Sequence, residues 1–242
     1  HKRGAIWHEG TMNLSSLRSL SLFVAALFPS TACLAQDAVP VPPATTSAQD
    51  SGFQAYLASL RGKAIAMGIR PETLDSVAPT LTPNPRVISL DQAQPGGSFD
   101  APIPPFEPYR QQHVTPALIA KGRVAWTGNR PILSRVEQDT GVPEAVMVAI
   151  FGHETSYGTF TGDFDLLRSL ATLAYEGRRR DLFEPEFLAT LKLLDKGIPR
   201  EKLVGSWAGA TGYPQFLPSV YLRVAKDADG DGVADIWRSQ AD

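Results

Sequence analysis

Residues 141–158 read GVPEAVMVAIFGHETSYG, and this stretch decides the fold and the site that the sequence predicts. Pro143 suits the first turn of a helix, where its missing N–H costs nothing. Four positions then recur at helical spacing and share one face: Met147, Ile150, Phe151 and Glu154. The stretch therefore predicts a helix with three apolar side chains and one carboxylate on the same face.

Glu154 is the candidate catalytic residue of this helix. A carboxylate on an apolar face is costly unless something compensates, and burial there favours its protonated form, as a general acid needs. The alternative is a structural glutamate that pairs with an arginine at the helix end. Spacing alone favours the structural alternative.

Helical spacing continues on both sides of this stretch. Apolar residues recur every three or four positions over residues 53–64, 115–138, 166–174 and 187–194. Gly68 and Gly197 are placed to end two of these helices, whereas residues 79–108 hold many prolines and are predicted to be irregular. Almost nothing alternates with a period of two, so the fold class is predicted to be mainly α.

The first 36 residues have the layout of a secretory signal. A basic Arg18 precedes an apolar segment, and residues 32–35 are mostly small. Met12 is expected to be the true start, and cleavage after Ala35 is favoured over lipidation of Cys33. The sequence thus predicts a periplasmic protein with three parts: residues 1–36 as upstream sequence and signal, residues 37–51 as a flexible linker, and residues 52–242 as the folded domain.

Composition excludes some classes of function. The hydrophobic content of 43% and the charged content of 20% are those of an ordinary soluble protein. Removal of residues 1–36 takes three basic residues and one acidic residue from totals of 23 and 25, and leaves a net charge of −4. Nucleic acid is therefore not expected as a partner, because binding to phosphates needs a positive surface.

The stretch at residues 205–218, GSWAGATGYPQFLP, combines small residues with aromatic ones. The small residues allow a ligand to approach the backbone closely. Tyr213 and Phe216 offer flat apolar faces, and Ser206 and Gln215 offer hydrogen-bonding groups, a mixture that suits a sugar. The alternative is a tightly packed loop with core aromatics.

Residues 227–235, DADGDGVAD, resemble a calcium-binding EF-hand loop. The expected metal ligands are Asp227, Asp229, Asp231, Val233 and Asp235. Position 12 of the loop is Arg238 in place of an acidic residue, and Asp242 is the only later carboxylate. The alternative is a solvated acidic turn.

The sequence lacks the residues that a zinc protease or a serine hydrolase would need. A zinc protease needs a second histidine four positions after His153, where Tyr157 stands. A serine hydrolase needs a G-x-S-x-G turn, which the Ser206 segment does not provide.

Three blocks carry a resemblance to a known family: residues 141–158, LRSLATLAYEGRRRDLFEPEFLATL at 167–191, and GSWAGATGYPQFLPSVY at 205–221 followed by DADGDGVADIW. In content, order and separation they resemble the membrane-bound lytic murein transglycosylase B family, from about Phe53 to the end. The resemblance implies a lysozyme-like catalytic domain, incomplete at its C-terminus because the family continues past Asp242. Thr211 departs from the family, in which Met is common at this position.

The resemblance also implies a role for each site residue. Glu154 matches the acid/base, Ser206 and Gln215 match the residues that contact substrate, and residues 227–235 match the calcium loop. Tyr213 and Phe216 match positions beside the cleft. Arg179 and Arg180 match the paired arginines that follow the next helix and are expected to bind substrate; the alternative is a solvated run of charges.

The implied function is cleavage of the β-1,4 bond between N-acetylmuramic acid and N-acetylglucosamine in peptidoglycan, with formation of a 1,6-anhydro ring. The chemistry needs no cofactor, and calcium is expected only in a structural role. The expected partners are glycan strands and wall-synthesis proteins, and the expected state is a monomer. Two alternatives remain: a lysozyme-type hydrolase and a non-catalytic wall-binding module.

Overall fold

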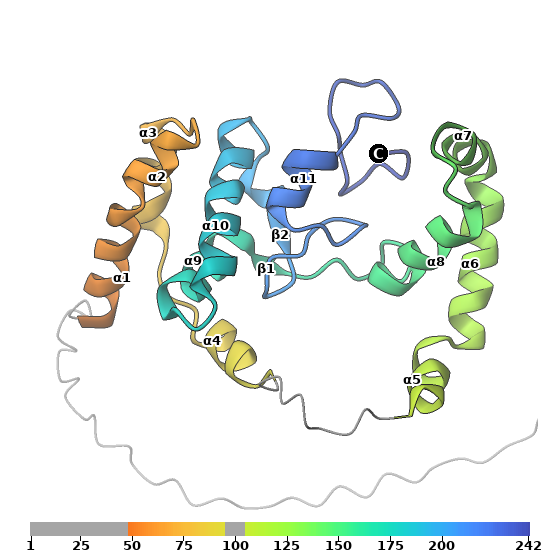
Figure 1. Cartoon of the computed structure of the whole chain (residues 1–242), viewed down its shortest axis with the longest axis horizontal. Coiled ribbons are helices and arrows are strands. Elements are labelled where there is room, and N and C mark those ends of the chain that lie inside the picture. The colour runs from red at the N-terminus through yellow and green to blue at the C-terminus, as the bar shows by residue number, and fades with distance from the viewer. Residues whose placement is uncertain (1–47, 95–104) are drawn as a thin grey trace, which may run out of the picture. The chain divides into compact units, whose positions relative to one another are not determined.

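The computed structural model describes residues 48–94 and 105–242 of the chain. These residues form helices and one two-stranded sheet, so the prediction of a mainly α fold is confirmed (Figure 1). The first helices are α1 (Ala48–Ser59), α2 (Arg61–Ala66), α3 (Pro71–Val77), η1 (Ala78–Thr80), α4 (Pro85–Gln92) and α5 (Phe106–His113). The rest are α6 (Pro116–Gly128), α7 (Arg130–Thr140), α8 (Glu144–Thr155), α9 (Leu166–Glu176), α10 (Arg180–Asp195), η2 (Arg200–Lys202) and α11 (Pro218–Val224).

The core is centred on α9, in which every residue from Leu166 to Ala174 except Arg168 is buried. The Asp165 side chain accepts a hydrogen bond from the Arg168 N–H at the start of this helix, and Gly177 ends it at a φ of 94°. Helices α1 and α10 pack against α9 through side chains that are almost fully buried, among them Phe53, Leu57, Phe183, Phe187 and Leu191. The periodic apolar positions of the sequence therefore form one continuous core.

The N-terminal boundary of this domain lies earlier than predicted. Helix α1 begins at Ala48, so residues 48–51 are helical, although their composition had placed them in the linker. The predicted signal and the rest of the linker lie outside the described residues.

Helix α4 corrects the prediction that residues 79–108 are mostly irregular. The Asn84 side chain accepts hydrogen bonds from the backbone N–H groups of Arg86 and Val87, at 3.1 and 3.4 Å, and Pro85 takes the first helical position. An asparagine cap followed by proline starts a helix. Proline breaks a helix in its interior, but at the first position, which Pro85 takes, it favours the start of one.

Asp91 connects α4 to the start of α10. Its side chain is 1% exposed and pairs with both Arg178 and Arg179, with Arg178 Nε 2.6 Å from Oδ2. Burial alone would raise the pKa of Asp91, but the hydrogen bonds from the two guanidinium groups outweigh it and hold that pKa below its usual range.

A short antiparallel sheet joins two segments that bear predicted site residues. β1 (Phe164–Asp165) pairs with β2 (Val204–Gly205), with Phe164 opposite Gly205. The approach is so close that a Cβ at Gly162 would lie 2.2 Å from the carbonyl of Gly205. The segment that follows α8 is therefore fixed to the start of the 205–218 loop.

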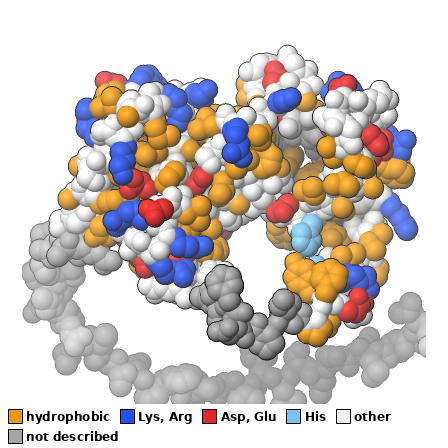
Figure 2. Space-filling model, in the orientation of Figure 1, with side chains coloured by type: hydrophobic (Ala, Val, Ile, Leu, Met, Phe, Trp, Pro, Cys, Tyr) orange, Lys and Arg blue, Asp and Glu red, His pale blue; other side chains and the backbone are white. Residues whose placement is uncertain are grey.

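Exposed apolar side chains gather on α5 to α8 (Figure 2). The largest exposed fractions there belong to Val124, Phe106 and Ile150, and Phe160, just after α8, is also exposed. No helix in the described ranges combines the length and the apolar character that crossing a membrane requires.

We expect Asp91→Asn to lower the free energy of unfolding by about 2–3 kcal/mol at pH 7, because two guanidinium groups lose their buried counter-charge. Since the pKa of Asp91 is lowered in the folded protein, this contribution is present at neutral pH and is lost as the pH falls below about 4. Urea denaturation of wild type and variant at several pH values measures both effects.

The matched control is Asp75→Asn, which breaks an aspartate–arginine pair whose side chains are 54% and 48% exposed. Little change is expected there, because solvent screens exposed pairs. Equal losses in the two variants would show that burial of Asp91 is not what makes its pairs stabilising.

Candidate active site

Glu154 lies in the last turn of α8, and its carboxylate is exposed. The prediction that Glu154 is buried on an apolar face is therefore wrong. Ile150, which lies on the same face of the helix, is also 52% exposed, so this part of the face is open to solvent. Helix α8 instead buries Glu144, Gly152 and Thr155. The described residues also provide no ion pair for Glu154, so the alternative of a structural pair with arginine is not confirmed either.

The chain turns sharply after Glu154. Ser156 and Tyr157 have φ values of 49° and 61°, and Gly158 follows at 79°. Side chains rarely adopt this left-handed region, and such residues concentrate at functional sites. Among the described residues, the one further non-glycine residue with positive φ is Gln215, at 52°.

Tyr157 fixes this turn against two helices. Its ring crosses a gap that two glycines leave open: a Cβ would lie 2.4 Å from the Tyr157 oxygen if built on Gly122 of α6, and 2.3 Å if built on Gly152 of α8. Burial raises the pKa of Tyr157. The last turn of α8, which carries Glu154, is thereby held against α6.

Tyr213 joins α8 to the 205–218 loop. The Thr155 hydroxyl lies 3.3 Å from the Tyr213 carbonyl oxygen, and the Tyr213 ring packs on Phe151 with centroids 5.4 Å apart. A Cβ at Gly158 would also meet the Tyr213 ring, at 2.6 Å. The structure thus brings the loop to the two residues that flank Glu154 on its helix.

Ser206 and Gln215 both shape the loop in which they lie. The Ser206 oxygen accepts a hydrogen bond from the Ala210 N–H at 3.0 Å, and the Gln215 amide nitrogen donates to the carbonyls of Gly212 and Thr161 at 2.9 and 3.3 Å. The described contacts leave the Ser206 hydroxyl proton and the Gln215 amide oxygen without a partner. One donor and one acceptor therefore remain for a ligand.

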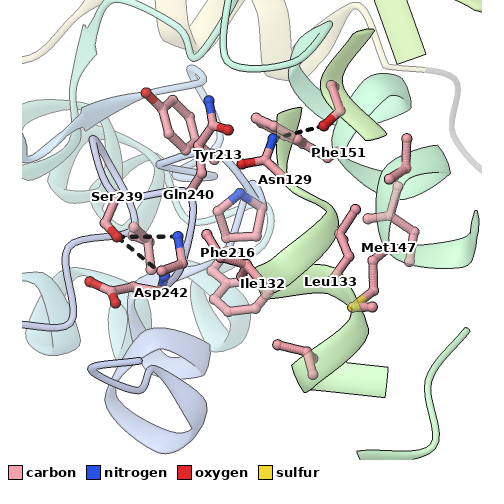
Figure 3. Close-up of a pocket in the computed structure, with 17 residues that line it drawn as sticks. Asn129, Ile132, Leu133, Met147, Phe151, Tyr213, Phe216, Ser239, Gln240 and Asp242 are labelled. Carbon is pink, nitrogen blue, oxygen red and sulfur yellow. Dashed lines mark hydrogen bonds between the residues drawn. The ribbon is translucent and has the colours of Figure 1, made fainter. Parts of the chain in front are cut away.

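An apolar hollow of about 410 Å³ lies beside this loop (Figure 3). Tyr213 and Phe216 line it together with residues of α6, α7, α8 and the segment 236–242. Glu154, Ser206 and Gln215 are not among its lining residues. The hollow is therefore next to the polar groups of the site and does not contain them.

Arg179 and Arg180 have partners inside the molecule. Arg179 pairs with Asp91, and its guanidinium lies 4.7 Å from the Phe183 ring centre and 5.9 Å from that of Trp207. Arg180 donates to the backbone carbonyl of Ala174 at 2.9 Å and lies over Tyr56. Arg179 thus reaches the 205–218 loop through Trp207, whereas the partners of Arg180 lie on α9 and α1. Their predicted contact with substrate stays a prediction.

In the acidic loop, the structure brings together Asp227, Asp229 and Asp242, with one carboxylate oxygen of each within 4.8 Å of the others. Backbone hydrogen bonds, first from the Gly232 N–H, lower the pKa of Asp227. Asp235 pairs instead with Lys202, at 2.8 Å.

The predicted ligands Asp231 and Val233 are not in this side-chain cluster, and Asp231 accepts a hydrogen bond from the Val233 N–H at 2.8 Å. Sequence reasoning missed Asp242 because its position lies beyond the twelve-residue pattern. The sequence feature that could have identified Asp242 is that no other carboxylate follows the loop.

A ladder of rings beside Glu154 was also missed. Tyr109 and His113 of α5 stack with centroids 3.9 Å apart, and His153, the neighbour of Glu154, lies 6.0 Å from His113. Phe106 extends the stack at its other end. The spacing of Phe106, Tyr109 and His113, at i, i+3 and i+7, is the signal that could have found it.

Gly122→Ala should lower the free energy of unfolding by about 1–3 kcal/mol, because the new methyl group overlaps the Tyr157 side chain. Urea denaturation tests this against Gly62→Ala, a helical glycine with no neighbouring atom within 4 Å, for which helix propensity predicts a small gain. A loss in the control as large as that in Gly122→Ala would contradict the role of Tyr157.

Comparisons with known proteins identify the family of this domain. The SLT_2 family, described as "Transglycosylase SLT domain", matches residues 52–242. Membrane-bound lytic murein transglycosylase B of Escherichia coli K12 is 36% identical over 153 residues, which are 61% of this chain and 42% of that protein.

Two solved structures show the same fold. SltB3 from Pseudomonas aeruginosa, in complex with NAG-anhNAM-pentapeptide, matches with a TM-score of 0.70 and 37% identity over 77% of this chain and 49% of that chain. Escherichia coli Slt35, in complex with calcium, matches with a TM-score of 0.64 and 31% identity over 79% and 59%. The chain spans about half the length of these relatives. Because the family match extends over the whole domain from residue 52 to residue 242, this chain belongs to the transglycosylase SLT domain family.

Proposed function

We propose that this chain carries the acid/base site of a peptidoglycan lytic transglycosylase. The observation that carries the proposal is the position of Glu154, in the last turn of α8 and just before a strained turn that Tyr157 fixes and that Tyr213 joins to the Ser206–Gln215 loop. Membership of the transglycosylase family supports it. So does the complex of SltB3 with an anhydro-muropeptide fragment.

In this proposal Glu154 serves as both acid and base. It first donates its proton to the glycosidic oxygen between N-acetylmuramic acid and N-acetylglucosamine, and the C–O bond breaks. The N-acetyl group of the substrate stabilises the electron-poor carbon, which is the substrate-assisted variant that needs no second carboxylate. Glu154 then takes the proton of the C6 hydroxyl as its oxygen closes the 1,6-anhydro ring.

Exposure of Glu154 is compatible with this role. A general acid must carry its proton when the substrate is bound, and a glycan strand that covers the last turn of α8 would exclude water from the carboxylate and favour the protonated form. The free donor of Ser206 and the free acceptor of Gln215 would orient the sugar, with Tyr213 and Phe216 beside it. Arg179 and Arg180 are assigned to this cleft by the family resemblance.

We also propose that the acidic loop binds Ca²⁺ in a structural role, through Asp227, Asp229 and Asp242. Three converging carboxylates repel one another without a cation, and oxygen ligands are those that Ca²⁺ prefers. The calcium complex of Slt35 supports the assignment. The ion would neutralise the loop and takes no part in the reaction.

The compartment and the partners follow from the substrate. Peptidoglycan strands lie outside the inner membrane, so we propose a periplasmic protein, in agreement with the signal-like pattern at residues 14–35. The proposed state is a monomer that works beside wall-synthesis proteins.

Glu154→Gln should reduce the release of anhydro-muropeptides from purified sacculi by about 10²–10⁴-fold, since it removes the only proposed acid/base. Mass spectrometry of the soluble products measures the loss. The matched control is Glu137→Gln, an exposed glutamate of α7, which should release the same products as the wild type.

The same experiment separates the alternatives. Products that end in reducing muramic acid would identify a hydrolase. Binding to sacculi without any soluble product, by a chain whose circular dichroism shows the folded state, would identify a wall-binding module.

Calcium should raise the melting temperature of the wild type by about 5 °C at saturating concentrations, because it binds only the folded loop. Asp242→Asn should remove most of this increment, whereas Asp139→Asn on α7 should retain it. Differential scanning calorimetry with calcium and with EDTA measures both. An increment that survives in Asp242→Asn would exclude Asp242 as a ligand.

A further inference from the structure

Thr211 is a fully buried residue whose hydroxyl joins two segments of the chain. It donates a hydrogen bond to the carbonyl of Val204, at 2.7 Å, and accepts one from the indole N–H of Trp237, at 2.8 Å. Both capacities of the hydroxyl are therefore used. A methionine, common in the family at this position, has no proton to donate and offers only a weak acceptor.

A second, independent bond joins the same two segments. The Tyr213 N–H donates to the carbonyl of Ile236 at 2.8 Å. Gly212 also packs directly on Ile236, since a Cβ at Gly212 would lie 2.7 Å from the Ile236 side chain, which is itself 2% exposed. Movement of residues 236–237 must therefore move residues 211–213.

Trp237 is also connected by hydrogen bonds to the carboxylates of the acidic loop and of Asp242. The Trp237 N–H donates to Asp235 at 3.1 Å, and the Asp235 N–H donates to the Asp242 carboxylate at 2.8 Å. Asp242 belongs to the carboxylate cluster with Asp227 and Asp229. A cation that repositions the Asp242 carboxylate therefore acts on Trp237 through two hydrogen bonds.

On the side of the active site, the path continues through Tyr213. Its ring packs on Phe151 and its carbonyl lies 3.3 Å from the Thr155 hydroxyl. These two residues precede and follow Glu154 on α8. The contacts thus run without a break from the carboxylate cluster to the last turn of α8, which is the physical requirement for coupling between two sites.

We propose that Thr211 is a positioning residue that couples cation binding in the acidic loop to the wall of the active site formed by residues 211–216. The proposal rests on the proposed calcium site and deepens the proposed function. Coupling between two binding sites is reciprocal. A bound muropeptide fragment must therefore tighten calcium binding by the same factor by which calcium tightens binding of the fragment.

The test compares Thr211→Val, which removes the hydroxyl at nearly constant volume, with Thr211→Ser, which retains it. Calcium affinity is measured by calorimetry with and without a NAG-anhNAM-pentapeptide fragment, and the indole N–H of Trp237 is followed by NMR, with Trp237→Phe to assign the signal. The buried-threonine control is Thr190→Val, because the Thr190 hydroxyl bonds only within α10, to the carbonyl of Glu186 at 2.7 Å.

In the wild type, calcium should shift the Trp237 indole signal, and the fragment should raise calcium affinity. Thr211→Val should weaken both responses, with a drop of about fivefold in the coupling factor, the contribution of one hydrogen bond, because the bond between Tyr213 and Ile236 remains. Thr211→Ser and Thr190→Val should keep both. Undiminished responses in Thr211→Val, an equal weakening in Thr190→Val, or equally weak responses in Thr211→Ser would each overturn the proposal.

The proposal and the proposed function fail in distinguishable ways. If Glu154 is not the acid/base, Glu154→Gln releases products normally while the Trp237 signal still responds to calcium. If wild-type calorimetry detects no calcium binding, the coupling is overturned whatever the activity on sacculi.

Discussion

The Tyr157 ring, inserted between Gly122 and Gly152, is the contact on which the geometry of the site depends. Two successive non-glycine residues in left-handed conformation cost about 1–2 kcal/mol each, so the turn after Glu154 would not form by itself. Burial of the Tyr157 ring and the hydrogen bond from the Gly158 N–H to the Thr155 hydroxyl, at 3.0 Å, offset this cost. The strain is thus confined to the two residues that follow the carboxylate.

The second wall of the site is supported differently. Residues 205–216 rest on the core, because Gly209 lies against the Leu170 side chain and Trp207 lies beside Arg179. Arg179 is in turn fixed by Asp91, so the buried ion pairs of α4 contribute indirectly to this wall. The positive charge of the Arg178–Arg180 run is therefore largely engaged within the molecule, and the neutral groups of Ser206 and Gln215 are the ones left for a sugar.

The sequence predicted the helices where burial has a regular period, as over residues 53–64 and 166–174. It failed at Glu154, because an apolar period indicates one face of α8 but does not show whether another element covers that face. Helix α4 could have been predicted, since Asn84-Pro85 is a local starting signal. The partners of Asp91 and of Asp242 could not have been predicted. Arg178 is 87 residues from Asp91, and Asp242 is 13 residues from Asp229, so these contacts depend on the tertiary fold and not on local sequence.

Thr211 shows how a departure from a family motif changes what a buried position does. Two hydrogen bonds join residues 211–213 to residues 236–237. The bond from the Tyr213 N–H to Ile236 is made by backbone groups, whereas the bond from the Trp237 indole N–H to the Thr211 hydroxyl is made by side chains and so depends on which residue stands at position 211. An apolar side chain at position 211 would fill the same space. It would, however, leave the indole N–H of Trp237 without its acceptor and the carbonyl of Val204 without the donor that Thr211 provides. A buried polar group without a partner is costly. The Thr211 hydroxyl therefore fixes how Trp237 lies against Val204, and so places the segment that follows the acidic loop next to the wall beside Glu154.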